Sequence, residues 1–298
     1  MKVFILLLHD LQSQGLIHPP KWLADNVHFL CYTGSTAYGM SGETSDLDVY
    51  GIAIPPLKMI FPHLDGVVPG FGNQGESFNS WSEHHINTPT TEYDFTVFSI
   101  VKFFHLAFEN NPNCVDVLFV PQRCILHSTK IGQMIRDRRK DFLSSHVALK
   151  TKAYAFSQLK KLNAKQSSDN PKRQATIDAH GYDTKHGSHV VRLCLQAQQI
   201  LLEGDLDLER NSEILKSVRR GEWSLERLQT WFAEKEMQLE KAYSETSLPR
   251  SPDEGTIKEL LLNCLETHYG SLDKAVTRQT DIDKVLAEMR QVIERHGG

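Results

Sequence analysis

The chain has 298 residues, of which 40% are hydrophobic and 23% are charged, and its formal net charge is −4. A chain of this length and composition can bury a full core and form two domains, and its net charge argues against a surface coated for non-specific nucleic-acid binding. Five cysteines without CxxC spacing indicate reduced thiols of a cytoplasmic protein, and no stretch approaches the ~20 apolar residues that a membrane-spanning helix needs.

The first part of the chain predicts a helix, a strand and a tight turn. Lys2–Gln14 is expected to be a packed helix, and the apolar run Val27–Cys31 is expected to be a strand that leads into Gly34 and Ser35. Glycine lets the backbone turn sharply and approach a ligand, while Ser35 offers a hydroxyl and an amide to a phosphate at the start of a short helix. The turn therefore suits the triphosphate of a nucleotide.

Two aspartates follow in a second predicted strand. Asp46 and Asp48 alternate with apolar residues, so that both side chains should point to the same face of the strand. Neighbouring carboxylates repel each other unless a cation lies between them, and hard oxygen ligands select Mg²⁺ or Mn²⁺. This stretch predicts a metal site beside the phosphate site.

A polar segment and a third strand come next. Residues 63–91 are rich in Gly, Asn, Ser, Pro and Thr, which predicts a long loop or hairpin that could serve as a lid or a substrate-facing arm. Zinc binding by His84 and His85 with Glu83 is disfavoured, because adjacent residues rarely point at one ion. Thr91–Val97 returns to alternation and predicts a strand with acidic residues on one face. These acids could also be ordinary surface groups.

Helices dominate the rest of the chain. A domain boundary near Lys140 is expected, which divides the chain into domains 1–140 and 141–298. The sequence predicts helices at Ser99–Glu109 with Ser99 as its cap, Ser144–Asn163, Ser188–Glu203 ended by Gly204, and Ser224–Ser244, followed by two helices after Pro252. A polar break is expected at Gln166–Pro171.

The helix Ser188–Glu203 carries a distinctive polar stripe. His189, Arg192, Gln196 and Gln199 recur at spacings of three and four residues, opposite an apolar stripe. A plain solvent face usually shows Glu and Lys instead. The stripe, preceded by Lys185, suits a phosphate or a nucleotide base, with an ordinary exposed face as the alternative.

Charge is unevenly distributed along the chain. Residues 130–192 contain 14 of the 33 basic residues but only 5 of the 37 acidic ones. This local excess indicates a polyanionic partner for the middle of the chain, with a solvated helix face as the alternative.

Several of these stretches together resemble one family. The residues concerned are Gly34-Ser35, Ala37-Tyr38-Gly39, Ser45-Asp46-Leu47-Asp48, Gly51, Pro55-Pro56, Asn111-Pro112-Asn113 with Val115 to Phe119, Gly181 to His189 with Val191-Arg192-Leu193, and Arg220-Gly221-Glu222. They resemble the DNA polymerase beta superfamily of nucleotidyltransferases, and most closely its RlaP-like (YcgL-type) branch, which is associated with RNA repair. The likeness spans about three-quarters of the chain and weakens after Pro249.

The resemblance carries expectations for fold and site. It implies an α+β protein, with an N-terminal nucleotidyltransferase fold in which helices flank a small mixed sheet, followed by a helical C-terminal domain. It places a third metal-binding carboxylate at Asp94, which would also take the proton of the attacking hydroxyl, with Glu92 as the rival. The expected nucleotide-binding residues are Gly34, Ser35, Tyr38, Lys185, His189 and Arg192.

The expected activity is the metal-dependent transfer of a nucleoside monophosphate from an NTP to a hydroxyl group. An RNA terminus is the favoured acceptor. A protein or small-molecule hydroxyl is the alternative, and a non-catalytic nucleotide sensor is a third possibility that Asp46, Asp48 and Asp94 together disfavour.

Overall fold

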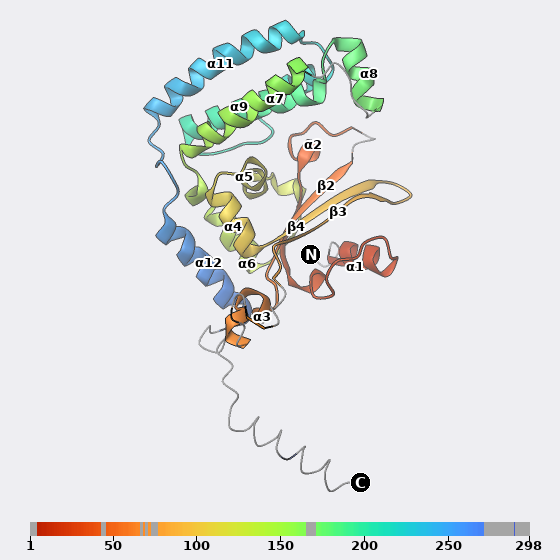
Figure 1. Cartoon of the computed structure of the whole chain (residues 1–298), viewed down its shortest axis with the longest axis vertical. Helices are drawn as coiled ribbons and strands as arrows, with labels where there is room; N and C mark the ends of the chain where they lie inside the picture. Colours follow the sequence, from red (N-terminus) through yellow and green to blue (C-terminus); the bar gives the residue numbers. More distant parts are fainter. Residues whose placement is uncertain are drawn as a thin grey trace.

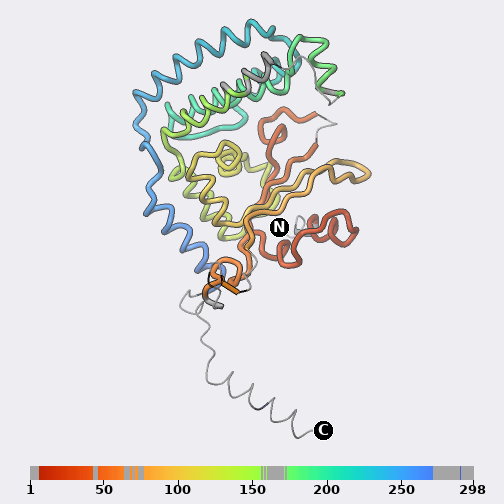
Figure 2. Tube along the Cα trace, viewed as in Figure 1, coloured from red at the N-terminus to blue at the C-terminus, as the bar shows by residue number. Residues whose placement is uncertain are grey.

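The computed structural model describes residues 5–42, 46–65, 68, 71–72, 77–164, 171–270 and 289. In this part of the chain, five strands form one mixed sheet that helices flank, and the C-terminal region is helical (Figures 1 and 2), which confirms the expected α+β class. The strands are β1 (Val27–Tyr32), β2 (Leu47–Ala53), β3 (Ser80–Asn87), β4 (Glu92–Ser99) and β5 (Ile125–Ser128).

The helices fall into an N-terminal set beside the sheet and a C-terminal set. The first set is α1 (Ile5–Ser13), α2 (Gly34–Ala37), α3 (Leu57–Ile60), α4 (Ile100–Phe108), α5 (Pro112–Phe119) and α6 (Lys130–Asp137). The second is α7 (His146–Ala164), α8 (Pro171–His180), α9 (Thr184–Glu203), α10 (Ser212–Arg219), α11 (Leu225–Glu245) and α12 (Glu254–Tyr269). Short 3-10 turns lie at Ala24–Asn26, Pro62–Asp65, Gln122–Cys124 and Arg139–Phe142.

The sheet has the strand order β3-β4-β2-β1-β5. β2 and β4 run parallel, and the other neighbouring pairs are antiparallel. The predicted strands at Val27–Cys31 and Thr91–Val97 are present as β1 and β4. The second half of the polar segment 63–91 contains the edge strand β3, which pairs with β4, so the hairpin expectation is correct for that half.

Alternating side chains of β1 enter two separate cores. Phe29 and Cys31 join the large core, whereas Leu30, which points to the opposite face, joins a smaller core beneath α1. Figure 1 shows α1 on the other side of the sheet from α4 and α6. The sheet is therefore covered on both faces.

The C-terminal helices pack on one another and return to the sheet layer. α9 packs against α7, α10 and α11, and α12 returns to contact α4 and α6 (Figure 1). One hydrophobic core extends from Phe29 to Leu265, so both halves of the chain contribute to it. The boundary near Lys140 stays a prediction, and it falls in the 3-10 turn where Phe142 packs edge-on against Phe104.

Helix ends match the sequence where a cap is visible. Ser99 accepts a hydrogen bond from the Lys102 amide at the start of α4, and Gly204 (φ 59°) ends α9, as predicted. However, α9 begins four residues earlier than predicted, because Asp183 caps it. The predicted break at Gln166–Pro171 falls largely outside the described residues, as does the second helix expected after Pro252. No helix among the described residues is long and apolar enough to span a membrane.

Candidate active site

The register of β2 and β4 places two of the predicted carboxylates together. In this parallel pair Asp48 lies directly opposite Asp94, so both side chains project from the same face of the sheet. Both residues are partly buried. Asp46 lies one residue before β2 and is exposed. Glu92, the rival of Asp94, lies two residues earlier on β4, opposite Asn87 of β3.

The charges around Asp48 fit a cation. Burial and the neighbouring charges of Asp94 and Asp46 raise the pKa of Asp48, whereas Lys185 and His84 act to lower it. A carboxylate that is destabilised by other carboxylates gains most from a bound positive charge. Asp48 and Asp94, paired on neighbouring strands, offer the hard oxygen donors that Mg²⁺ and Mn²⁺ take, and Asp46 precedes β2 close enough for its charge to act on Asp48.

The predicted phosphate turn lies directly against this group. Gly34 has a φ of +57°, and a Cβ atom at this position would lie 1.9 Å from Oδ2 of Asp48. The Thr33 amide also donates to the Asp48 carbonyl at 2.8 Å. Glycine is thus needed both for its backbone angle and for its close approach to the carboxylate. Ser35 follows within α2 and is partly buried.

A bulge in β3 brings two histidines to Asp94. The register shifts between Glu83 and Ile86, and His85 has a φ of 58°. The His85 amide donates to Oδ1 of Asp94 at 2.7 Å, and Nδ1 of His84 lies 3.6 Å from the same oxygen. Glu83 instead accepts from the His18 amide and from the indole of Trp81. A zinc group of Glu83 with both histidines is therefore not assembled.

The N-terminus of α9 lies within electrostatic reach of Asp48. Lys185, in the first turn of α9, is exposed, and its charge acts to lower the pKa of Asp48. The capping residue Asp183 accepts from the amides of Lys185 and His186. Burial acts to raise the pKa of Asp183, but contacts with His186 and Arg173 outweigh it and lower this pKa to about 2. Asp183 therefore stays ionised and fixes the start of this helix.

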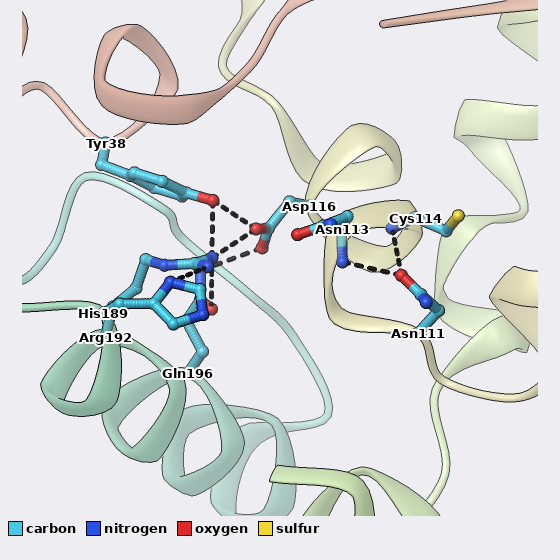
Figure 3. Close-up of polar contacts among 8 residues, drawn as sticks. All are labelled: Tyr38, Asn111, Asn113, Cys114, Asp116, His189, Arg192 and Gln196. Carbon is cyan, nitrogen blue, oxygen red and sulfur yellow. Dashed lines mark hydrogen bonds and ion pairs between the residues drawn. The ribbon is translucent and has the colours of Figure 1, made fainter. Parts of the chain in front are cut away.

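Three further predicted nucleotide-binding residues, Tyr38, His189 and Arg192, meet in a largely buried cluster (Figure 3). Nη1 of Arg192 lies 2.5 Å from both the Tyr38 hydroxyl and Oδ2 of Asp116, and the Tyr38 hydroxyl donates to the same carboxylate. The Gln196 amide donates to Oδ1 of Asp116 at 2.9 Å, and Nη2 of Arg192 lies 3.0 Å from Nδ1 of His189. Asp116 is 2% and Arg192 is 5% exposed.

This cluster changes the interpretation of the polar stripe on α9. Arg192, Gln196 and Gln199 are buried, so the stripe is not an exposed face. It joins α9 to α5 and to the residue that follows α2. Tyr38, His189 and Arg192 are thus brought together with one another, whereas Gly34 and Lys185 are brought to Asp48.

Asp116 is the residue that sequence reasoning missed. It is a single acid within the apolar run Val115 to Phe119, and it occupies the centre of the cluster. A lone carboxylate in such a run needs a buried partner, which is the signal that could have identified it.

Comparison with known proteins identifies the family. The family model described as RlaP, the RNA repair pathway DNA polymerase beta family, matches residues 13–288. Because this match covers most of the chain, the protein belongs to the RlaP family, and thus to the nucleotidyltransferases of the DNA polymerase beta superfamily. The resemblance seen in the short motifs is confirmed.

Individual relatives are more distant. An uncharacterized 38.9 kDa protein from the nrdC-mobD intergenic region of Enterobacteria phage T4 is 27% identical over 119 residues, which are 39% of this chain and 33% of the phage protein. The match thus spans about a third of that relative's length. The crystal structure of a nucleotidyltransferase-like protein from Exiguobacterium sibiricum 255-15 has 10% identity and a TM-score of 0.29, with 98% of this chain and 91% of that chain covered.

Proposed function

We propose that this protein is a metal-dependent nucleotidyltransferase that moves a nucleoside monophosphate from an NTP to a hydroxyl group and releases pyrophosphate. Membership of the RlaP family supports the class of reaction. The observation that carries the proposal is the pairing of Asp48 with Asp94 on neighbouring parallel strands, with the Gly34 turn directly against Asp48.

The residues present fit the divalent metal that the family implies. Asp46, Asp48 and Asp94 offer carboxylate oxygens alone, and the pKa of Asp48 is raised by burial and then by its acidic neighbours, as expected of a site completed by a cation. We propose that these three residues hold Mg²⁺ or Mn²⁺. When bound, such ions neutralise charge on the triphosphate and lower the pKa of the attacking hydroxyl.

The chain's own residues supply position and electrostatics. We assign Asp94 as the acceptor of the hydroxyl proton, because it is the carboxylate opposite Asp48. The backbone at Gly34 and Ser35 holds the terminal phosphates, and Lys185 offsets charge that develops on the departing pyrophosphate. Tyr38, His189 and Arg192 act through the buried cluster, which fixes α2 relative to α9, rather than by contact with the nucleotide.

The favoured acceptor is an RNA terminus, in the cytoplasm. The RNA repair pathway in the family description supports this acceptor. A protein or small-molecule hydroxyl is the second candidate, because acidic residues from other segments neutralise part of the positive charge of residues 130–192, which weakens the case for RNA binding there. Lys140 pairs with Asp205, Lys150 with Glu109 and Lys152 with Glu236, at 2.6, 3.2 and 3.0 Å, and all three acids come from outside residues 130–192.

The test is to incubate the protein with each labelled NTP and Mg²⁺, offering RNA, DNA and protein acceptors separately. Label on RNA with a free terminal hydroxyl, and none on the same RNA with that hydroxyl blocked, is the expected result. RNA affinity should also fall with salt, with a log–log slope of roughly 0.7 per phosphate contact for single strands. Label on protein alone would establish the second candidate, and no transfer to any acceptor would contradict the proposed class.

A further inference from the structure

The bulge in β3 places potential metal-binding side chains beside Asp94, which lies on β4 between β3 and the Asp48 strand β2. In a regular strand, adjacent side chains point to opposite faces, so His84 and His85 could not both reach the acidic residues of β4. The register shift and the left-handed backbone of His85 remove this restriction. Nδ1 of His85 lies 2.6 Å from Oε1 of Glu92, and Nδ1 of His84 lies 3.6 Å from Oδ1 of Asp94.

Three of these side chains already have the spacing of a metal-binding group. One nitrogen of His85 and one oxygen each of Glu92 and Asp94 all lie within 4.8 Å of one another. A tetrahedral ion with bonds of about 2.0–2.1 Å separates its ligand atoms by about 3.3 Å. To bind such an ion, Nδ1 of His85 and Oε1 of Glu92 need only move apart from 2.6 Å to about 3.3 Å.

The donor types indicate which ion would bind. Mg²⁺ takes oxygen ligands almost exclusively, whereas imidazole nitrogen beside carboxylate suits Zn²⁺ and related transition ions. We propose that His85, Glu92 and Asp94 form a second metal site, selective for an ion of the Zn²⁺ class. His85 is exposed, and Glu92 and Asp94 are partly buried, so solvent or the nearby His84 can complete the coordination.

The second site shares Asp94 with the carboxylate group described above. An ion held by His85 and Glu92 draws Asp94 away from Asp48, so occupancy of this site inhibits nucleotidyl transfer. This consequence rests on the proposed function, whereas binding of the ion does not. The two claims can therefore fail separately.

The binding claim is tested on the full chain with Co²⁺, whose visible absorption reports a site of low coordination number. We expect one Co²⁺ to bind, Zn²⁺ to displace it, and a large excess of Mg²⁺ to leave it in place. His85→Asn, which tolerates the left-handed backbone, and Glu92→Gln should each weaken Co²⁺ binding at least tenfold. His18→Gln is the matched control, because His18 is an exposed histidine that lies beside Glu83 instead.

Asp48→Asn separates this site from the catalytic carboxylates. The variant should lose nucleotidyl transfer but still bind Co²⁺ with the wild-type spectrum. The proposal is overturned if folded His85→Asn and Glu92→Gln, checked by circular dichroism, bind Co²⁺ as tightly as the wild type. It is also overturned if Mg²⁺ displaces Co²⁺, or if Asp48→Asn abolishes Co²⁺ binding, since either result would place the ion at the catalytic carboxylates.

Discussion

Gly34 has a left-handed backbone and lies directly against the proposed metal ligand Asp48. Gly34→Ala would force a Cβ atom into the space of the Asp48 carboxylate, which lies 1.9 Å from the ideal Cβ position. A displacement of about 1 Å at a reacting group can cost on the order of a hundredfold in rate, and we expect a loss of at least that size in turnover.

The matched control is Gly15→Ala. Gly15 also has a positive φ, of +70°, but a Cβ atom there meets nothing within 4 Å. Gly15→Ala should lose about 1 kcal/mol of stability to backbone strain, measured by urea unfolding, and Gly34→Ala at least as much because of its clash with Asp48; only Gly34→Ala should lose activity. Normal turnover in Gly34→Ala would show that Asp48 need not occupy this position.

At the residue scale, sequence could predict the local motif but not the distant partners. Gly34, Asp46 and Asp48 lie within fifteen residues, so their spacing alone indicates a turn beside two carboxylates. Arg192 on its own resembles a phosphate contact, because Asp116, which holds it, is 76 residues away in the chain. A pairing over that distance leaves no periodic signal.

At the scale of elements, the buried cluster joins α5, α9 and the end of α2. Asp116→Ala would leave the guanidinium of Arg192 buried without its carboxylate partner, and we expect it to cost about 3–5 kcal/mol of unfolding free energy. The measurement is urea unfolding. The control Glu245→Ala breaks the exposed Lys241–Glu245 pair and should cost less than about 1 kcal/mol.

A double variant distinguishes an uncompensated charge from lost packing. Asp116→Leu with Arg192→Met replaces both charged groups by apolar ones, so it should be more stable than Asp116→Ala. Equal instability of the two would mean that packing, rather than the charge of Arg192, sets the cost.

A pair of histidines links α12 to β1. Nε2 of His28 in β1 lies 2.9 Å from Nδ1 of His268 in α12, and its other nitrogen lies 3.0 Å from the Thr129 hydroxyl. Burial, followed by the charges of His268 and His127, lowers the pKa of His28 to about 4. The unfolded chain therefore binds a proton near pH 6.5 that the folded chain binds only near pH 4.

Stability from His28 is thus present above pH 6.5 and is lost as the pH falls towards 4. His28→Gln should flatten the loss of urea stability over this range, by on the order of 1–2 kcal/mol after allowing for partial solvent exposure. His63→Gln, at an exposed position, should retain the wild-type slope. An unchanged slope in His28→Gln would contradict the role of this pair.

Elements were predictable where periodicity was long or a cap was visible. β4 and α9 show clear alternation and helical spacing, and Gly204 marks the end of α9. The helices α5, α6 and α10, each of 8 residues, are too short for periodicity to separate them from loops. The bulge of β3 depends on its pairing with β4, which is not visible in β3 alone.

At the scale of the whole molecule, charge counted along the sequence differs from charge in space. The excess of basic residues in 130–192 is partly offset by acids from other segments, and Arg192 is buried with Asp116. Sequence alone could not predict this, because the compensating acids Glu109, Asp205 and Glu236 come from segments outside residues 130–192. The case for RNA as acceptor therefore rests on the family more than on this segment.

Asp48 and Asp94, rather than Glu92, form the proposed catalytic carboxylate pair. The most direct measurement is single-turnover transfer from a labelled NTP, with chelator-treated protein and Mg²⁺ as the only added metal. Asp48→Asn and Asp94→Asn should each lose on the order of a thousandfold in rate while remaining folded, and Glu92→Gln should stay close to the wild type. Full activity in both aspartate variants, or a loss in Glu92→Gln that Asp94→Asn does not show, would contradict the account.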